Sequence, residues 1–228
     1  MDQQAPNQPA SIGATGTQGT AGVTGSASAD TWPRFLDDCD RCRNCSLGNT
    51  RQHVVVYRGA VRAPLMIIGE GPGAEEDLQG KPFVGAAGRL LDLLLTAQGF
   101  PPESYHIGNI VKCRPPENRV PTEDEAKACR PLLARQFRFV KPSYIVLLGA
   151  TAYKYFTGLN DGITKIRGQW IEKNGYHIMP TFHPAYILRN DRERVRLFED
   201  LATVRAAMEA EGLLTPLDGP PVMPTGRR

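Results

Sequence analysis

Short runs of apolar residues alternate along the chain with longer stretches in which apolar positions recur at helical spacing. Four runs lack polar alternation and are predicted as strands buried on both faces: Leu65 to Gly69, His106 to Val111, Tyr144 to Gly149 and His177 to Phe182. The helical stretches are Ala86 to Gln98, Thr122 to Val140, Ala150 to Phe156 and Arg192 to Glu211. This alternation indicates a three-layer α/β/α fold with a central four-stranded, mainly parallel sheet.

Two local patterns refine these elements. Thr122 followed by Glu125 forms a capping box, and Pro121 stands just before it, which is typical of a helix start. Lys165 to Tyr176 contains Asn174-Gly175 as a tight turn, so we expect a hairpin added to the core.

The two ends of the chain differ from the middle in composition. Residues 1–30 contain no aromatic residue and no Leu, so they cannot bury enough apolar surface to offset the entropy of folding. We expect a disordered tail there, a single domain over residues 31–213, and a second disordered tail over residues 214–228, which is rich in Pro and Gly.

Charge and hydropathy exclude some classes of protein and leave others open. No run approaches the ~20 apolar residues of a membrane span. Met1 leads into polar residues without an apolar signal segment, and five cysteines in 228 residues are too sparse for a disulfide framework. We therefore expect a cytoplasmic, monomeric protein in a reducing compartment. The net charge of +3 neither favours nor excludes binding to nucleic acid.

Four of the cysteines are candidate ligands of an iron-sulphur cluster. Cys42, Cys45, Cys113 and Cys129 follow a 2-67-15 spacing, and a cluster accepts thiolates from distant segments. Structural zinc is the alternative, but it usually takes both ligand pairs from short loops, whereas fifteen residues separate Cys113 from Cys129. Cys39 and Cys42 form a second, overlapping CxxC pair that the sequence also permits. We favour Cys42 and Cys45, with Cys39 as a bystander.

A glycine-rich loop follows the first predicted strand. The segment Gly69 to Asp77 allows the backbone to approach a ligand closely and to direct amide N–H groups toward it. Gly69, Gly71 and Ala74 also match a loose dinucleotide fingerprint. That reading is disfavoured because three acidic residues stand where a pyrophosphate would dock, and no strand ends about 20 residues further on.

Three further candidates lie near the expected carboxyl ends of the strands or in the adjoining loops, where ligands bind in such sheets. Phe83 is either a plug of the core or a ring that stacks on a flat base. Asn109 either braces a turn or reads one base edge with a donor and an acceptor placed side by side. His183 stands between Phe182 and Pro184 at the end of the last strand, although a lone His is usually structural.

Four segments together resemble a known family. GEGPGAEED, GKPFVG, GNIVKCRPPENR and PTFHPAYILR, joined to the cysteine set, closely resemble the family 4 uracil-DNA glycosylases over Cys42 to Val204. The resemblance implies a three-layer fold with a 4Fe-4S cluster that removes uracil from DNA. It further implies these roles: Cys42, Cys45, Cys113 and Cys129 as cluster ligands; Gly69, Glu70 and Gly71 as the pocket lining; Phe83 as the stacking ring; Asn109 as the reader of the polar base edge; and His183 at the O2 side.

The residue types suit this chemistry. Cleavage between uracil and its sugar leaves an anionic base and a cationic sugar, so His183 and the loop amides would serve the base. Glu70 and the DNA phosphates would serve the sugar. The nucleotide must flip out of the helix, and an apolar wedge often fills the gap. The wedge candidates are Tyr186, Ile187 and Leu188, unless the last two begin a helix. The phosphate candidates are Arg189, Arg119, Arg114 and Lys112, unless they are ordinary solvated surface.

Two departures limit the transfer of roles. Related glycosylases carry an Asp at the position of Gly71, which orients the attacking water, and a Tyr at Gly73, which excludes thymine. We assign the first role to Glu70 and the second, on weaker grounds, to Glu76.

Proteins of this fold that trap uracil-DNA covalently, or bind it without turnover, are the alternative. The trapping proteins carry a His in the loop after the second strand, and residues 114–121 hold none. A zinc-bound nucleic-acid protein without catalysis is a further alternative.

Overall fold

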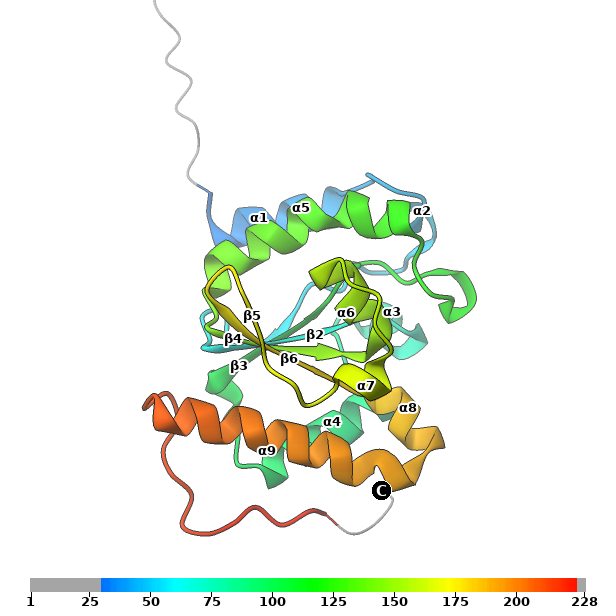
Figure 1. Cartoon of the computed structure of the whole chain (residues 1–228). Helices are drawn as coiled ribbons and strands as arrows, with labels where there is room; N and C mark the ends of the chain where they lie inside the picture. The colour runs from blue at the N-terminus through cyan, green and yellow to red at the C-terminus, as the bar shows by residue number, and fades with distance from the viewer. Residues whose placement is uncertain (1–29, 225–228) are drawn as a thin grey trace, which may run out of the picture. The chain divides into compact units, whose positions relative to one another are not determined.

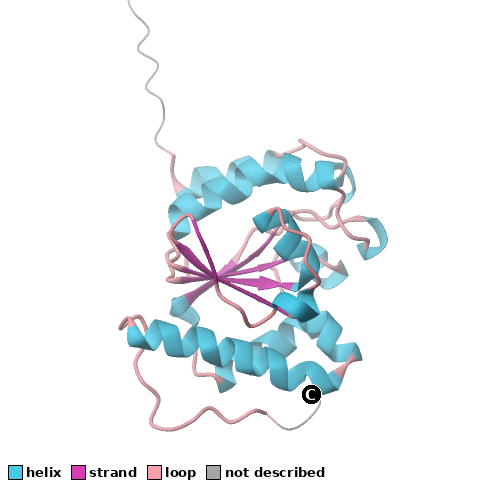
Figure 2. Ribbon diagram, viewed as in Figure 1, coloured by secondary structure: helices cyan, strands magenta, loops and turns pink. Residues whose placement is uncertain are grey.

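The computed structural model describes residues 30–224, and the chain from Thr31 onward forms one compact unit. The predicted tail of residues 1–30 lies, apart from Asp30, outside the described residues, and the boundary there stays a prediction. A central sheet is covered by helices on both faces, which confirms the three-layer α/β/α fold (Figures 1 and 2). Among the described residues, no helix is long and apolar enough to cross a membrane.

The sheet has six strands rather than four. Their order is β1 (Arg58–Gly59), β3 (Tyr105–Asn109), β2 (Leu65–Gly69), β4 (Tyr144–Leu148), β6 (Tyr176–Thr181) and β5 (Ile171–Lys173). The four central strands are parallel and are the four predicted from the apolar runs. The two short outer strands pair antiparallel. They are partly exposed and carry no long apolar run, so hydropathy alone did not reveal β1.

The β5–β6 pair is the predicted hairpin. Asn174 and Gly175 both have positive φ, at 53° and 79°, which suits the tight turn expected of Asn-Gly. The hairpin does not stand apart from the fourth strand, because its second arm is β6 itself.

Each face of the sheet has its own apolar core. On one face lie α4 (Ala86–Ala97) and α9 (Arg194–Ala210), which pack leucines against the inward side chains of β2 and β4. On the other lie α1 (Trp32–Arg41), α5 (Glu123–Val140) and α6 (Gly149–Thr157). The capping box of α5 is confirmed, since the Glu125 amide donates to Thr122 Oγ1 and the Thr122 amide donates to Glu125 Oε2.

Several short elements lack enough helical turns to show periodicity in the sequence. They are α2 (Leu47–Thr50), α3 (Ala74–Gln79), α7 (Ile163–Ile166), α8 (Pro184–Arg189) and the 3-10 turns η1 (Pro102–Ser104), η2 (Pro116–Asn118) and η3 (Asp191–Glu193). Of these, α3 and α8 directly follow the carboxyl ends of strands and position the site.

Ordered contacts extend past the predicted end of the domain at residue 213. Leu214 is buried, and the Arg205 side chain donates to the main-chain oxygen of Thr215 at 2.7 Å. A tail that begins at residue 214 is therefore wrong for these first residues, because their burial repays the entropy of ordering them. Residues 225–228 lie outside the described residues.

Candidate active site

A cavity of about 520 Å³ opens at the carboxyl edge of the sheet. This edge is common to β2 and β3, whose last residues Gly69 and Asn109 are paired, and to β4 and β6. Ligands bind at such an edge in open parallel sheets. The predicted residues that line the cavity are Glu70, Gly71, Phe83, Asn109, Arg119, His183, Tyr186 and Arg189.

Phe83 and His183 face each other in this cavity. Their ring centroids are 5.7 Å apart with an interplanar angle of 30°. Phe83 has a positive φ of 55°, which is rare for a bulky residue and marks a position that the surroundings hold in place. Gly88 permits this conformation, because a Cβ there would lie 1.8 Å from the main-chain oxygen of Phe83.

Asn109 presents an unsatisfied acceptor at the floor of the cavity. The residue is almost fully buried, and its Oδ1 atom has no hydrogen-bond partner. Gly69 leaves the space open: a Cβ there would lie 2.5 Å from Phe83 Cζ and 2.6 Å from Asn109 Oδ1. A buried acceptor without a partner costs about 1–3 kcal/mol, so this atom is prepared for a ligand that donates to it.

His183 lies at the N-cap of α8, and its local contacts define its tautomer. The main-chain N–H of Ala185 donates to Nδ1 at 3.1 Å, so Nδ1 is unprotonated and the remaining proton is on Nε2. Burial and, to a smaller extent, the nearby positive charge of Arg189 lower the pKa of His183 to about 4. At neutral pH the ring is therefore a neutral N–H donor.

Glu76 joins the glycine loop to the loop that carries Phe83. Its Oε2 atom accepts from the Gly73 amide, and its Oε1 atom accepts from the amides of Val84 and Gly85 at 3.0 and 2.8 Å. The carboxylate thus fixes the two walls of the cavity relative to each other. The sequence analysis missed this role. A Glu three residues after a helix N-cap, as Glu76 is after Gly73, was the pattern that indicated it.

Glu70 is half-buried in the cavity wall. Burial raises the pKa of its carboxyl group, and a hydrogen bond with the Thr151 side chain acts in the opposite direction. Thr151 belongs to α6, which begins at the carboxyl end of β4. It was not among the predicted site residues.

The cysteines converge behind the site. Cys42, Cys45, Cys113 and Cys129 line one small cavity together with Cys39. As their side chains lie, the described residues contain no group of three or more His, Cys, Asp or Glu close enough to hold a metal ion. Four thiols around a common cavity nevertheless suit a cluster, because a cluster of several irons holds its ligands further apart than one ion does.

The cations beside this cavity support an anionic group. Lys112 is fully buried among Cys39, Cys113 and Cys129, and it pairs with no carboxylate of the described residues. Arg51 Nη1 donates to Cys113 Sγ at 2.9 Å. A buried charge needs a compensating charge, and the thiolates of a cluster supply one. The residues therefore fit the implied group. The prediction that Lys112 meets phosphates is wrong, because its Nζ atom donates to the main-chain oxygen of Asn109.

The fifth thiol, Cys39, belongs to α1 and reaches the same cavity, but it is fully buried and also packs with Phe35 and Val56. Burial raises the pKa of its thiol to about 12. This environment is that of a core residue and accords with the choice of Cys42 and Cys45.

The predicted wedge residues separate in the structure. All three lie in α8, but Ile187 is fully buried in the core and cannot enter DNA, so that prediction is wrong. Leu188 is 49% exposed, and Tyr186 lines the cavity with its ring packed on Phe182. Successive helical residues point about 100° apart, so Ile187 faces the core while Leu188 faces solvent.

Of the predicted phosphate contacts, Arg189 is exposed at the end of α8 and lines the cavity. The guanidinium of Arg119 forms a two-pronged ion pair with Glu125 at 2.8 and 2.7 Å. Arg114 donates to Asn118 Oδ1, within its own loop.

The chain is similar to several known proteins. The model of the "Uracil DNA glycosylase superfamily" matches residues 56–204. The chain is 44% identical over 176 residues to a type-4 uracil-DNA glycosylase of Thermotoga maritima, covering 75% of this chain and 92% of the relative. It is 42% identical over 186 residues to a type-4 uracil-DNA glycosylase of Saccharolobus solfataricus, covering 78% and 86%. A type-5 uracil-DNA glycosylase of Pyrobaculum aerophilum is 26% identical over 144 residues, covering 56% and 63%.

Proposed function

The chain belongs to the type-4 uracil-DNA glycosylases, and we propose a role for each side chain of its cavity in that reaction. It excises uracil from DNA as a step of DNA repair, cleaving the bond between the base and its sugar. The single observation that carries the proposal is the convergence of Phe83, Asn109 and His183 on one cavity, with the acceptor of Asn109 unsatisfied.

Asn109 reads the base. Its free Oδ1 acceptor matches the N3–H donor of uracil, and its amide NH₂ can donate to O4. Cytosine offers an acceptor at N3 and a donor at its exocyclic amine, so both contacts would be mismatched. Because each mismatch leaves a buried polar group unpaired, we expect discrimination of at least about a hundredfold.

Phe83 holds the base plane. The flipped uracil stacks on this ring opposite the walls formed by the glycine loop, and base stacking on an aromatic ring contributes about 1–3 kcal/mol. Glu76 positions the Phe83 ring by accepting hydrogen bonds from the amides of Val84 and Gly85, the two residues after Phe83. The Glu76 carboxylate, fixed by hydrogen bonds from three amides, lines the cavity wall and excludes the methyl group of thymine.

His183 stabilises the leaving base. The neutral ring donates Nε2–H to the O2 side, where negative charge develops as the glycosidic bond breaks. A donor already in place at such an atom contributes about 3 kcal/mol to the transition state. Since the Nδ1 atom is held by the Ala185 amide, the ring need not reorient during the reaction.

Glu70 acts at the sugar. Its half-buried carboxylate at the edge of the cavity can orient the attacking water and stabilise the cationic sugar. The Thr151 hydrogen bond opposes the effect of burial and helps to keep the group ionised.

The cysteine cavity would hold a 4Fe-4S cluster through Cys42, Cys45, Cys113 and Cys129. When bound, the cluster ties the segment after α1 to the loop after β3 and supplies no redox step, because hydrolysis transfers no electrons. Lys112 and Arg51 offset its negative charge.

The exposed end of α8 meets the DNA. Leu188, which is exposed on α8, fills the gap left by the flipped nucleotide, and Arg189 contacts a phosphate. Tyr186 lines the entrance of the cavity. Arg119, held by Glu125, presents a fixed rather than a mobile cation beside the same entrance.

An oligonucleotide with one uracil tests the function. Treatment with the protein, then heating in alkali, should cut the strand at uracil and leave matched cytosine and thymine strands intact, without added metal. The control is the double variant His183→Ala, Asn109→Ala. If the wild-type protein cut the strand no more than the double variant does, the proposed glycosylase activity would be wrong. A covalent protein–DNA band in denaturing gels would instead support a trapping protein.

A further inference from the structure

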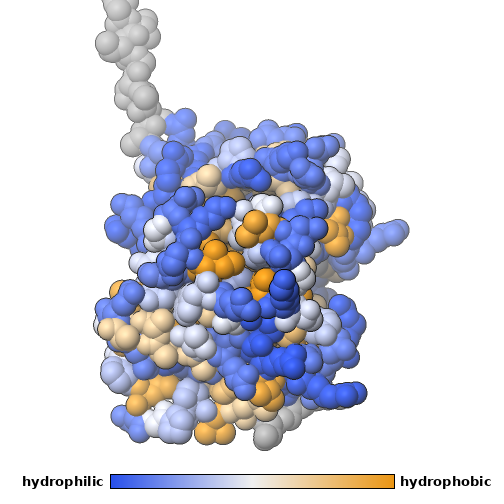
Figure 3. All heavy atoms as spheres, viewed as in Figure 1, coloured by the Kyte–Doolittle hydropathy of each residue, from blue (hydrophilic) through white to orange (hydrophobic). Residues whose placement is uncertain are grey.

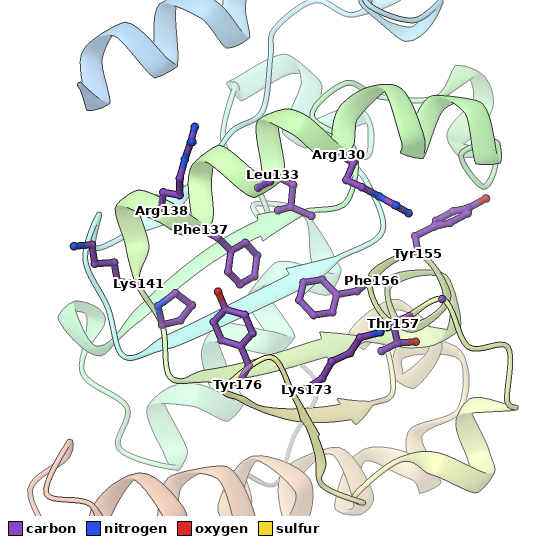
Figure 4. A pocket seen from close by; sticks show the side chains of 13 residues that line it. Arg130, Leu133, Phe137, Arg138, Lys141, Tyr155, Phe156, Thr157, Lys173 and Tyr176 are labelled. Carbon is purple, nitrogen blue, oxygen red and sulfur yellow. Dashed lines mark hydrogen bonds between the residues drawn. The ribbon is translucent and has the colours of Figure 1, made fainter. Parts of the chain in front are cut away.

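A second and larger cavity lies away from the base pocket and shares no residue with it. It is a groove of about 940 Å³ between α5, the end of α6 and the β5–β6 hairpin (Figure 4). Its lining consists of Arg130, Leu133, Ala134, Phe137, Arg138, Lys141, Pro142, Tyr155, Phe156, Thr157, Gly158, Lys173 and Tyr176. Neither uracil binding nor the cysteine cavity uses these residues.

The floor of the groove is apolar and partly open to solvent. Phe137 packs against Phe156 with ring centroids 5.6 Å apart, and against Tyr176 at 5.5 Å. All three rings are only partly buried. Figure 3 shows hydrophobic side chains gathered on this face below α5, within a largely hydrophilic surface. A continuous apolar patch with a polar border is typical of an interaction site.

The border is positively charged. Four lining residues are cations, and none of the lining residues is acidic. Arg138 and Lys141 lie at one end and Arg130 near the other, so the charges flank the aromatic floor on both sides (Figure 4). Lys173 Nζ donates to the main-chain oxygen of Thr157, which holds a further positive charge at the hairpin side.

The chemistry of the groove selects among occupants. Residues 1–29 carry one acidic residue, Asp2, and no aromatic residue, and the chain ends in two arginines, so neither end matches a basic, aromatic groove. Single-stranded DNA would use the cations, but it also needs a flat ring face for each base. Here Phe137 is tilted by 33° against Phe156 and meets Tyr176 nearly edge-on at 68°, so the three rings do not form a row of parallel faces.

We propose that this groove binds an acidic peptide segment of a partner protein. One large apolar side chain of the segment packs on Phe137 and Phe156, and flanking carboxylates pair with Arg130, Lys141 and Lys173. Because the groove and the base pocket are separate, the partner and DNA bind at the same time. The groove therefore recruits the enzyme without occupying its site.

A labelled synthetic peptide tests this. The probe is a fluorescein-tagged dodecapeptide with one Phe flanked by Asp and Glu, titrated with the full cluster-loaded chain and followed by anisotropy. We expect saturable micromolar binding, weakened about tenfold in the double variant Arg130→Glu, Lys141→Glu. Replacing the peptide Phe with Ser should abolish binding. The control variant Arg196→Glu, on α9 at the other face of the sheet, should bind like the wild type.

Three results would overturn the proposal: no saturable binding of the peptide, equal binding by the double variant, or displacement of the peptide by an oligothymidylate of equal length. The last would assign the surface to nucleic acid. Uracil excision by the double variant should equal that of the wild type, so the test is independent of the proposed roles in the base pocket.

Discussion

Lys112 Nζ donates to the main-chain oxygen of Asn109 at 2.9 Å, and this bond joins the cysteine cavity to the floor of the base pocket. The ammonium group lies among Cys39, Cys113 and Cys129, and Asn109 lines the base pocket. A buried cation thus connects the two sites over a separation of three residues along the chain.

Replacing Lys112 with Met should weaken both sites. The thiolates lose a compensating charge and the Asn109 oxygen loses its donor, so we expect lower iron content and a roughly tenfold fall in kcat/KM on uracil DNA. Iron analysis and single-turnover kinetics measure the two effects. Lys154→Met, on the surface of α6, is the matched control. Full iron content with unchanged kinetics would show that the bond has no such role.

Replacing Asn109 with Asp should reduce the preference for uracil over cytosine. The variant replaces the amide donor with a second acceptor, which penalises uracil O4 and accommodates the cytosine amine. We expect the ratio of the two kcat/KM values to fall about a hundredfold. Excision from matched uracil and cytosine strands measures it, and an unchanged ratio would remove Asn109 from base reading.

Cys113→Ser and Cys39→Ser should behave differently. We expect the first to lose the visible absorbance and the iron of the cluster and to lower the yield of folded protein, because a ligand is lost. The second removes a thiol that packs with Phe35 and Val56, so iron content should remain. A colourless wild type, or iron loss in the Cys39 variant alone, would contradict the ligand assignment.

Replacing Arg189 with Ala should lower the salt dependence of DNA binding. Each phosphate contact contributes about one unit to the slope of log K against log salt, so we expect the slope to flatten by about one. Binding titrations over a range of salt provide the slope. Arg62→Ala, an exposed residue just before β2 at the opposite edge of the sheet, should leave it unchanged. If the Arg189→Ala and Arg62→Ala variants had the same slope, Arg189 would make no phosphate contact.

The stability of the folded chain should fall as the pH drops from about 6.5 to about 4. Burial lowers the pKa of His183 and of His106 to about 4, from an ordinary value of 6.5. In this range the unfolded chain binds protons at these residues and the folded chain does not, so the free energy of unfolding decreases. Above 6.5 both contributions are fully present.

Denaturant unfolding at several pH values measures this dependence. His183→Asn removes one of the two titrating rings, so the free energy of unfolding of the variant should decrease less steeply over the same range than that of the wild type. Equal slopes would mean that His183 is accessible to protons in the folded chain.

The four central strands could be predicted because they are short continuous apolar runs, and the longer helices because each has enough residues to show its period. Every residue of Leu65 to Gly69 and of Tyr144 to Leu148 is buried. A strand that is covered on both faces is apolar at successive positions, and this pattern is visible in the sequence. The edge strand β1 and helix α8 have two and six residues, too few for a period to emerge.

The candidate site was predicted from its residue types and from motifs that place them at strand ends. Residue chemistry made Phe83, Asn109 and His183 candidates, the family resemblance gave them roles, and parallel strands bring their carboxyl ends to one edge. Which neighbours fix them was not available from the sequence, because Glu76 reaches the amides of Val84 and Gly85 only after the loop has folded back on itself.

The sequence by itself determined the layered architecture, the set of thiols and the candidate side chains of the base pocket, since hydropathy and functional-group chemistry are properties of the residues. Only the tertiary structure decided which groups are buried and what they contact. In the folded chain Ile187 is buried in the core, and Lys112 donates to the main-chain oxygen of Asn109. The Ala185 amide determines the tautomer of His183, and a groove lies beside Phe137. Burial and partnership depend on segments far apart in the chain, and no local pattern encodes them.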